Sequence, residues 1–82
     1  MRFSIISEIP GRTRLQLAGP VPESDLDALL KLGGDIDGVH KVRVYGRIGQ
    51  MALEYDESRR DAVLAAVGAL DAQAIADAKT GY

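Results

Sequence analysis

Polar and apolar residues alternate along three stretches of this chain, and this pattern limits the fold more than any other feature of the sequence. The stretches are Arg12–Leu17, Val39–Tyr45 and Gln50–Tyr55. Alternation with a period of two is typical of strands that bury one face and expose the other. The reversal Gly46-Arg47-Ile48-Gly49 separates the last two stretches and predicts a β-hairpin. An antiparallel sheet with one covered face is therefore expected.

We expect the first strand to be long. Phe3-Ser4-Ile5-Ile6-Ser7 is rich in β-branched residues, and Pro10-Gly11 stands between it and the alternating residues that follow. Proline lacks a backbone N–H and is tolerated at bulges. The sequence is therefore interpreted as one strand, Phe3–Leu17, with a kink or bulge at Pro10-Gly11.

Two stretches between the strands follow a helical repeat. The first comes after Ser24, has leucines at helical spacing and ends at Gly33-Gly34, and the second comes after Ser58 and covers residues 62–70. Each of these serines stands three residues before an aspartate, which predicts a capped helix start. Two amphipathic helices are therefore expected to cover one face of the sheet.

The C-terminal segment leaves two alternatives open. Residues 72–78 alternate like a strand, whereas their alanines favour a helix, which makes residues 72–82 an irregular or helical tail. As a strand, the segment completes the order strand, helix, strand, strand, helix, strand. On that interpretation residues 1–82 form a single α+β domain, a ferredoxin-like split βαβ sandwich (βαββαβ) with two helices on one face of an antiparallel sheet.

Composition excludes several classes of site and partner. The 82 residues include no cysteine, which removes disulfides, thiolate metal sites and cysteine nucleophiles. A net charge of −2 and an aromatic content of 5% are not typical of nucleic-acid binding. No stretch approaches the ~18 apolar residues of a membrane span, and the N-terminus does not resemble a signal peptide. We expect a cytoplasmic domain that binds no nucleic acid and reaches a membrane only through a partner.

Three segments, in this order and with a helix-sized gap after the first, resemble a known family. They are Ile9-Pro10-Gly11-Arg12-Thr13-Arg14-Leu15, Asp37-Gly38-Val39-His40-Lys41-Val42-Arg43-Val44 and Gly49-Gln50-Met51-Ala52-Leu53-Glu54-Tyr55-Asp56. The chain resembles the heavy-metal-associated (HMA-like) domains at the N-termini of metal-transporting P-type ATPases and in small metallochaperones, above all their divergent, cysteine-less branch. The resemblance covers roughly residues 5–70 and implies a role in metal transport or homeostasis, with iron among the metals considered.

The chain departs from that family at the metal site. Metal-binding members carry Cys-x-x-Cys after the first strand, and the two positions fall here at Pro22 and Asp25. Proline cannot ligate a metal, and one aspartate cannot replace two thiolates for a soft ion. The resemblance therefore implies a place in metal traffic without a thiolate site, and we expect no bound metal and no cofactor.

Four cationic side chains form the candidate binding site. Arg12 and Arg14 lie two apart in one strand, and Lys41 and Arg43 lie two apart in another, so all four are predicted on the face opposite the helices. Such a face suits an anionic group or a partner protein. The alternative is that an uncovered antiparallel face is polar only because it is solvated.

No catalytic residue is predicted. The serines have no base partner in the sequence, and His40, the only histidine, has no apparent metal or catalytic partner. We therefore expect no enzyme but a binding, adaptor or regulatory domain that docks on a metal transporter or another protein. The alternative is a small-ligand binder that holds a phosphate or a porphyrin carboxylate on the arginine-lined face.

Self-association depends on the C-terminal segment. If residues 72–78 are helical, the N-terminal strand lacks a neighbour and Phe3-Ser4-Ile5-Ile6 presents unpaired backbone groups at a sheet edge. Such an edge pairs readily with another strand. The sequence then predicts a homodimer that pairs this segment with itself, antiparallel.

Overall fold

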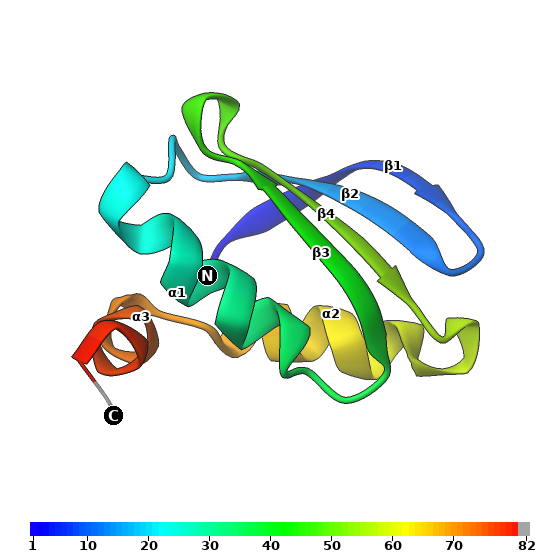
Figure 1. Cartoon of the computed structure of the whole chain (residues 1–82). Helices are drawn as coiled ribbons and strands as arrows, with labels where there is room; N and C mark the ends of the chain where they lie inside the picture. The colour runs from blue at the N-terminus through cyan, green and yellow to red at the C-terminus, as the bar shows by residue number, and fades with distance from the viewer. Residues whose placement is uncertain (81–82) are drawn as a thin grey trace.

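The computed structural model describes residues 1–80 as an α+β protein with one four-stranded antiparallel sheet. The elements are β1 (Phe3–Ile9), β2 (Arg12–Leu17), α1 (Glu23–Gly34), β3 (Val39–Tyr45), β4 (Gln50–Tyr55), α2 (Arg60–Ala69) and α3 (Ala72–Thr80), with short 3-10 turns η1 (Gly46–Ile48) and η2 (Glu57–Arg59). The strands lie in the order β1-β2-β4-β3. Figure 1 shows α1 and α2 on one face of the sheet, while the other face carries no helix.

A tight turn divides the predicted first strand in two. Ile9 pairs with Arg12, so residues 3–17 form the antiparallel hairpin β1–β2 and not one kinked strand. Gly11 has a φ of 79°, which suits the third position of a type II turn, and proline favours the position before it. The one-strand prediction is wrong because Pro10-Gly11 is a turn signal, and the alternation on its two sides fits two strands as well as one.

Of the two alternatives left open for residues 72–78, the strand is wrong and the helix is confirmed, because these residues belong to helix α3. The carboxylate of Asp71 accepts a hydrogen bond from the backbone N–H of Ala74 at the start of this helix, and Lys79 pairs with Asp25 of α1 at 2.8 Å. The alanine-rich composition favours this outcome. β1 takes the position beside β2 that the last strand was expected to fill. Residues 81–82 of the predicted 72–82 tail lie outside the described residues.

The core lies between the sheet and the helices. Its fully buried side chains are Leu15 of β2, Leu29 of α1, Met51 and Leu53 of β4, and Val63 and Val67 of α2. The period-two alternation predicted for β2 and β4 is confirmed, because their large apolar residues face the helices. In β3 the alternation holds from Lys41 to Tyr45 and is interrupted by a register shift between Val39 and Lys41. Within residues 1–80, no helix has the length and apolar character needed to cross a membrane.

The predicted serine caps are not formed. α1 begins at Glu23, one residue before Ser24, and no side chain caps it. α2 begins at Arg60, after the turn η2, and it is Asp56 whose carboxylate accepts a hydrogen bond from the backbone N–H of Ser58. The helices thus lie close to their predicted positions, but the capping pattern in the sequence does not identify their first residues.

Candidate functional site

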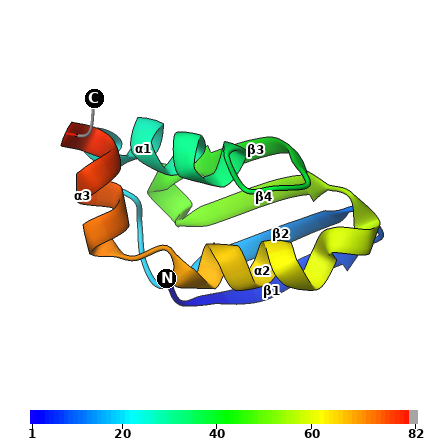
Figure 2. The same ribbon diagram turned by 90° about the horizontal axis from the view of Figure 1, so that it is seen from below.

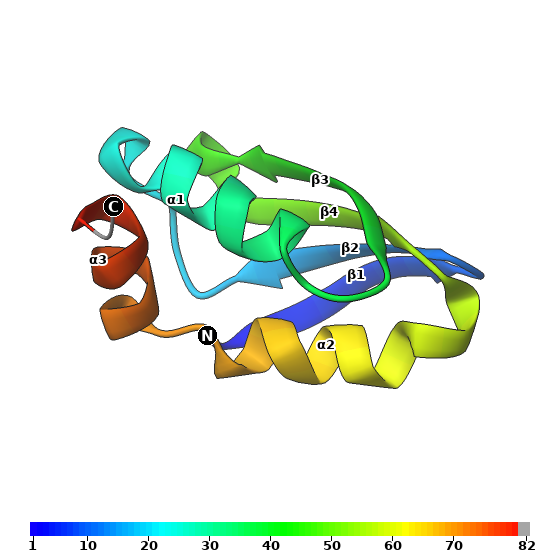
Figure 3. The same ribbon diagram turned by 60° about the horizontal axis from the view of Figure 1, so that its bottom comes forward.

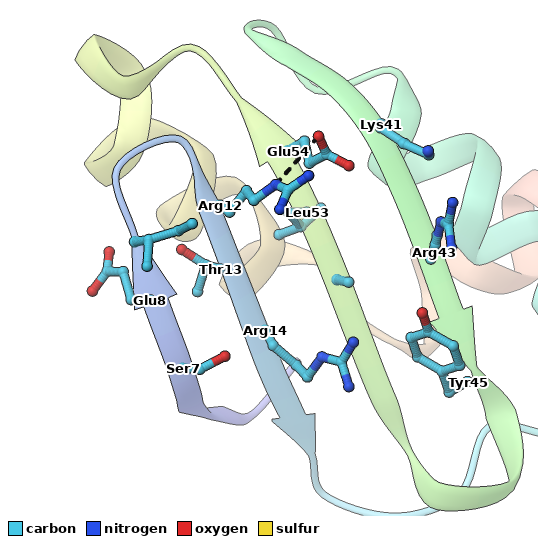
Figure 4. A pocket seen from close by; sticks show the side chains of 12 residues that line it. Ser7, Glu8, Arg12, Thr13, Arg14, Lys41, Arg43, Tyr45, Leu53 and Glu54 are labelled. Carbon is cyan, nitrogen blue, oxygen red and sulfur yellow. Dashed lines mark ion pairs between the residues drawn. The ribbon is translucent and has the colours of Figure 1, made fainter.

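All four predicted cations lie on the sheet face away from the helices, here called the open face. Arg12 and Arg14 project from β2, Lys41 and Arg43 project from β3, and all four are exposed. They line a shallow depression of about 400 Å³ that extends over the middle of the sheet (Figure 4). The structure therefore brings the predicted residues together on one surface, while their binding role stays a prediction.

Strand register arranges the open face in three rows that cross the sheet. The central row has two arginines on either side of a small residue and consists of Ser7, Arg14, Ala52 and Arg43. Neighbouring strands lie about 4.8 Å apart, so the Cα atoms of Arg14 and Arg43 are roughly 10 Å apart. Because Ala52 ends at Cβ, the space above the sheet between the two arginines is left open.

In a second row, on one side of the central row, a carboxylate offsets part of the charge of two cations. This row consists of Ile9, Arg12, Glu54 and Lys41. Arg12 Nε lies 3.5 Å from Glu54 Oε1, as the dashed line in Figure 4 marks. Glu54 therefore lies between two cations and offsets part of their charge, which leaves the central row as the more electropositive part of the face.

The third row is uncharged and consists of Ser4, Gln16, Gln50 and Tyr45. The side-chain amide of Gln16 donates hydrogen bonds to the carbonyls of Ile48 and Gly49, at 2.8 and 3.1 Å, and it accepts one from Gln50 at 3.3 Å. These bonds tie the β3–β4 hairpin to β2. They hold the two strands that carry the cations in one register.

Tyr45 positions an arginine of the central row. The guanidinium carbon of Arg14 lies 5.2 Å from the centroid of the Tyr45 ring, within the range of a cation–π interaction. The contact holds Arg14 over the sheet without neutralising its charge. The sequence places Tyr45 and Ala52 on the outward side of their strands, but their neighbours depend on the pairing of β2 with β4, which local alternation does not report.

The open face is more cationic than the chain as a whole. Its strand residues include four cations and one carboxylate, Glu54, which leaves a formal charge of +3, whereas the 82 residues together carry −2 and the rest therefore −5. Glu8 of β1 does not reduce the charge of the face, because its carboxylate turns to Arg60 of α2, at 2.6 and 3.1 Å. The hydrogen bond from Arg60 lowers the pKa of Glu8 below its ordinary value.

The resemblance to HMA-like domains predicts that Pro22 and Asp25 stand where metal-binding members have cysteines, and both lie at the start of α1. Pro22 immediately precedes the helix, and the carboxylate of Asp25 in its first turn is paired with Lys79 of α3. His40 is exposed, at a register shift between Val39 and Lys41 of β3. No group of three or more His, Cys, Asp or Glu side chains within residues 1–80 is arranged to hold a metal ion.

Comparisons with known proteins found no match for this chain among protein-family models, curated proteins or solved structures.

Proposed function

We propose that this chain is a non-catalytic docking domain that binds an acidic segment of a partner protein on its open face. The observation that carries the proposal is the central row, where Arg14 and Arg43 flank Ala52. Within residues 1–80, neither arginine is paired with a carboxylate. Both are therefore available to an incoming anion.

The chemistry of the central row suits a carboxylate. A guanidinium presents a planar fork of N–H donors that matches two carboxylate oxygens, and such charge-assisted bonds are stronger than neutral ones. A carboxylate placed above Ala52 can accept hydrogen bonds from Arg14 on one side and from Arg43 on the other. Glu54, in the neighbouring row, already lies against a guanidinium of this face, with its Oε1 3.5 Å from Arg12 Nε.

A protein segment suits this surface better than a small molecule. Small-ligand sites bury 70–90% of the ligand in a concave pocket, whereas this depression is shallow and lies on the face of a sheet (Figure 4). Four strands of six or seven residues span roughly 20 Å in each direction, or about 400 Å². That is about half of the ~800 Å² per partner in stable complexes. We therefore expect a weak complex that is sensitive to salt.

The resemblance to HMA-like domains supports a partner from metal transport, on the cytoplasmic side of a membrane. The order β2-α1-β3-β4-α2 follows the ferredoxin-like plan, and β1 lies where that plan has its last strand. We therefore include in the proposal a ferredoxin-like fold whose fourth strand comes from the N-terminus. In this arrangement the face opposite the helices remains free for docking.

A titration with defined anions tests the proposal. The ¹⁵N-labelled chain is titrated with a hexaglutamate peptide and, separately, with inorganic phosphate, at low and at high salt. We expect the peptide to shift the amides of the central row and to bind more weakly as salt rises. The double variant Arg14→Ala/Arg43→Ala should weaken peptide binding about tenfold or more, which corresponds to about 1.4 kcal/mol.

A matched control variant distinguishes binding at Arg14 and Arg43 from a general effect of net charge. Arg2→Ala/Lys31→Ala removes the same charge from exposed residues outside the open face and should leave peptide affinity within about twofold. Equal weakening by the two double variants would mean that the peptide responds only to net charge, which overturns the proposal. Phosphate that binds as tightly as the peptide would instead favour the small-ligand alternative.

A further inference from the structure

We propose that two copies of this chain associate edge to edge, with β1 antiparallel to β1 of the second copy and α2 beside its counterpart. β1 is an end strand of the sheet and pairs with β2 on one side only. The backbone groups on its other side are not paired with any strand within residues 1–80. A free edge of this kind is a template for one more antiparallel strand.

The edge strand β1 exposes three isoleucines beside two serines and Glu8. Ile5, Ile6 and Ile9 are 42%, 47% and 57% exposed, and they make up three of the five large hydrophobic residues exposed within residues 1–80. Ile6 lies at the middle of β1, where the register shifts and the residue has no partner in β2. Its backbone and side chain are therefore not needed for the β1–β2 pairing and remain available to a second strand.

Helix α2 extends this edge beneath the sheet. Figures 2 and 3 show α2 alongside β1, and contacts join them at both ends, because Phe3 lies close to Gly68 and Glu8 pairs with Arg60. From Ala62 to Leu70 the sequence carries no charge. The exposed positions of α2 include three alanines, Ala62, Ala65 and Ala69. Small side chains permit the close approach of a second α2, and burial of the combined surface favours association.

The opposite edge of the sheet is built differently. β3 exposes His40, Lys41 and Arg43 and has a register shift between Val39 and Lys41. Exposed charged side chains, lysine above all, are devices by which edge strands avoid pairing, and cations on two copies repel each other. The register shift does not distinguish the two edges, because β1 has one as well, between Ile5 and Ser7. At the β1 edge, by contrast, Arg60 pairs with Glu8 and with Asp61 within each copy, so this cation is not free to repel a second copy. The contrast favours the β1 edge and a second copy, which presents the same isoleucines and the same internally paired charges.

The size of the edge predicts a weak dimer. Seven residues at about 3.3 Å each give an edge of roughly 23 Å, and the shortest extent of the molecule is 17 Å. The product is about 400 Å² per copy and about 800 Å² for the pair, which is below the range of stable complexes and typical of transient ones. Antiparallel self-pairing has its two-fold axis perpendicular to the sheet. Both open faces then lie on the same side of one eight-stranded sheet.

Sedimentation equilibrium of the full chain, from about 20 μM to about 1 mM, tests the proposal. The wild type should pass from monomer to dimer across this range. Ile6→Lys places two like charges opposite each other near the two-fold axis and should remain a monomer throughout. Ile48→Lys makes the same change at another exposed isoleucine, 56% exposed in η1 and away from the edge, and should dimerise like the wild type. Far-UV circular dichroism establishes that both variants are folded.

Hydrogen exchange of the wild type provides a test that needs no variant. Backbone amides of β1 that point away from β2 should become more protected as concentration rises, whereas the outward amides of β3 should not change. A wild type that stays monomeric at about 1 mM overturns the proposal. So does a dimer that Ile6→Lys leaves intact, or one whose added protection appears on β3. Because none of these measurements uses an anion, failure here leaves the docking of an acidic segment on the open face unaffected.

Discussion

Tyr55→Phe perturbs a buried polar contact directly beneath the open face. The phenol oxygen of Tyr55 and Oγ1 of Thr13 lie 2.5 Å apart, and the two residues are only 4% and 3% exposed. Thr13 stands between Arg12 and Arg14 in β2 but points into the core. The pair therefore joins β2 to β4 on the covered face while the arginines project from the other. It supports the register on which the rows of the open face depend.

The magnitude follows from burial. Removing the Tyr55 hydroxyl leaves the Thr13 hydroxyl buried without a partner, which costs about 1–3 kcal/mol. With about 2.1 cal/mol/K of unfolding entropy per residue, a chain of 82 residues loses roughly 6–17 °C of Tm. Replacing both groups, as Thr13→Val with Tyr55→Phe, leaves no unpaired hydroxyl. The double variant should therefore be more stable than Tyr55→Phe alone.

A double-mutant cycle measures this coupling. The wild type, the two single variants and the double variant are unfolded in urea and followed by far-UV circular dichroism, so that each free energy of unfolding comes from the same probe. We expect the loss of unfolding free energy in the double variant to be smaller than the sum of the two single losses by about 1 kcal/mol or more. Strictly additive losses would show that the two hydroxyls do not interact and would refute the reasoning.

Two further predictions concern acid stability and a turn. The pKa of Glu8 is lowered by its hydrogen bond from Arg60, so the stabilisation is present above the ordinary value of 4.5 and is lost as pH falls through the folded-state value. The urea midpoint of the wild type should therefore fall as pH drops below 4.5, and the midpoint of Glu8→Gln should fall less. The same pH dependence in both proteins would contradict this. Gly49 has a φ of 63°, and a Cβ there would overlap the carbonyl oxygen of Gly19. Gly49→Ala should therefore cost about 1–3 kcal/mol, measured by urea unfolding, whereas Gly34→Ala, in open space, should be neutral or slightly stabilising.

The side of the sheet on which each residue lies follows from local sequence. In β2 and β3, the alternation of charged with apolar residues predicts that Arg12, Arg14, Lys41 and Arg43 share the face opposite the helices, and the structure places them there. Side chains alternate along any strand regardless of its partners. The four candidate residues were therefore accessible to sequence reasoning, although their neighbours were not.

Local signals were ambiguous where two structures satisfy the same pattern. Residues 3–17 alternate in the same way whether Pro10-Gly11 bends one strand or turns between two, and only the pairing of Ile9 with Arg12 decides for a hairpin. Residues 72–78 alternate like a strand, but their alanines favour a helix, and the place beside β2 is already filled by β1. Whether β1 or residues 72–78 pair with β2 depends on the whole fold, and the sequence of residues 72–78 alone does not indicate it.

The sequence by itself determined the α+β class, the β3–β4 hairpin, the two helices that cover the sheet and the outward direction of the four cations, because each of these depends on residues close together in the chain. Only the tertiary structure decided the strand order, the opposition of Arg14 and Arg43 across Ala52, and the contrast between a β1 edge that exposes isoleucines and a cationic β3 edge. These features depend on which strands become neighbours. That choice is set by burying one common core among segments that are distant in sequence.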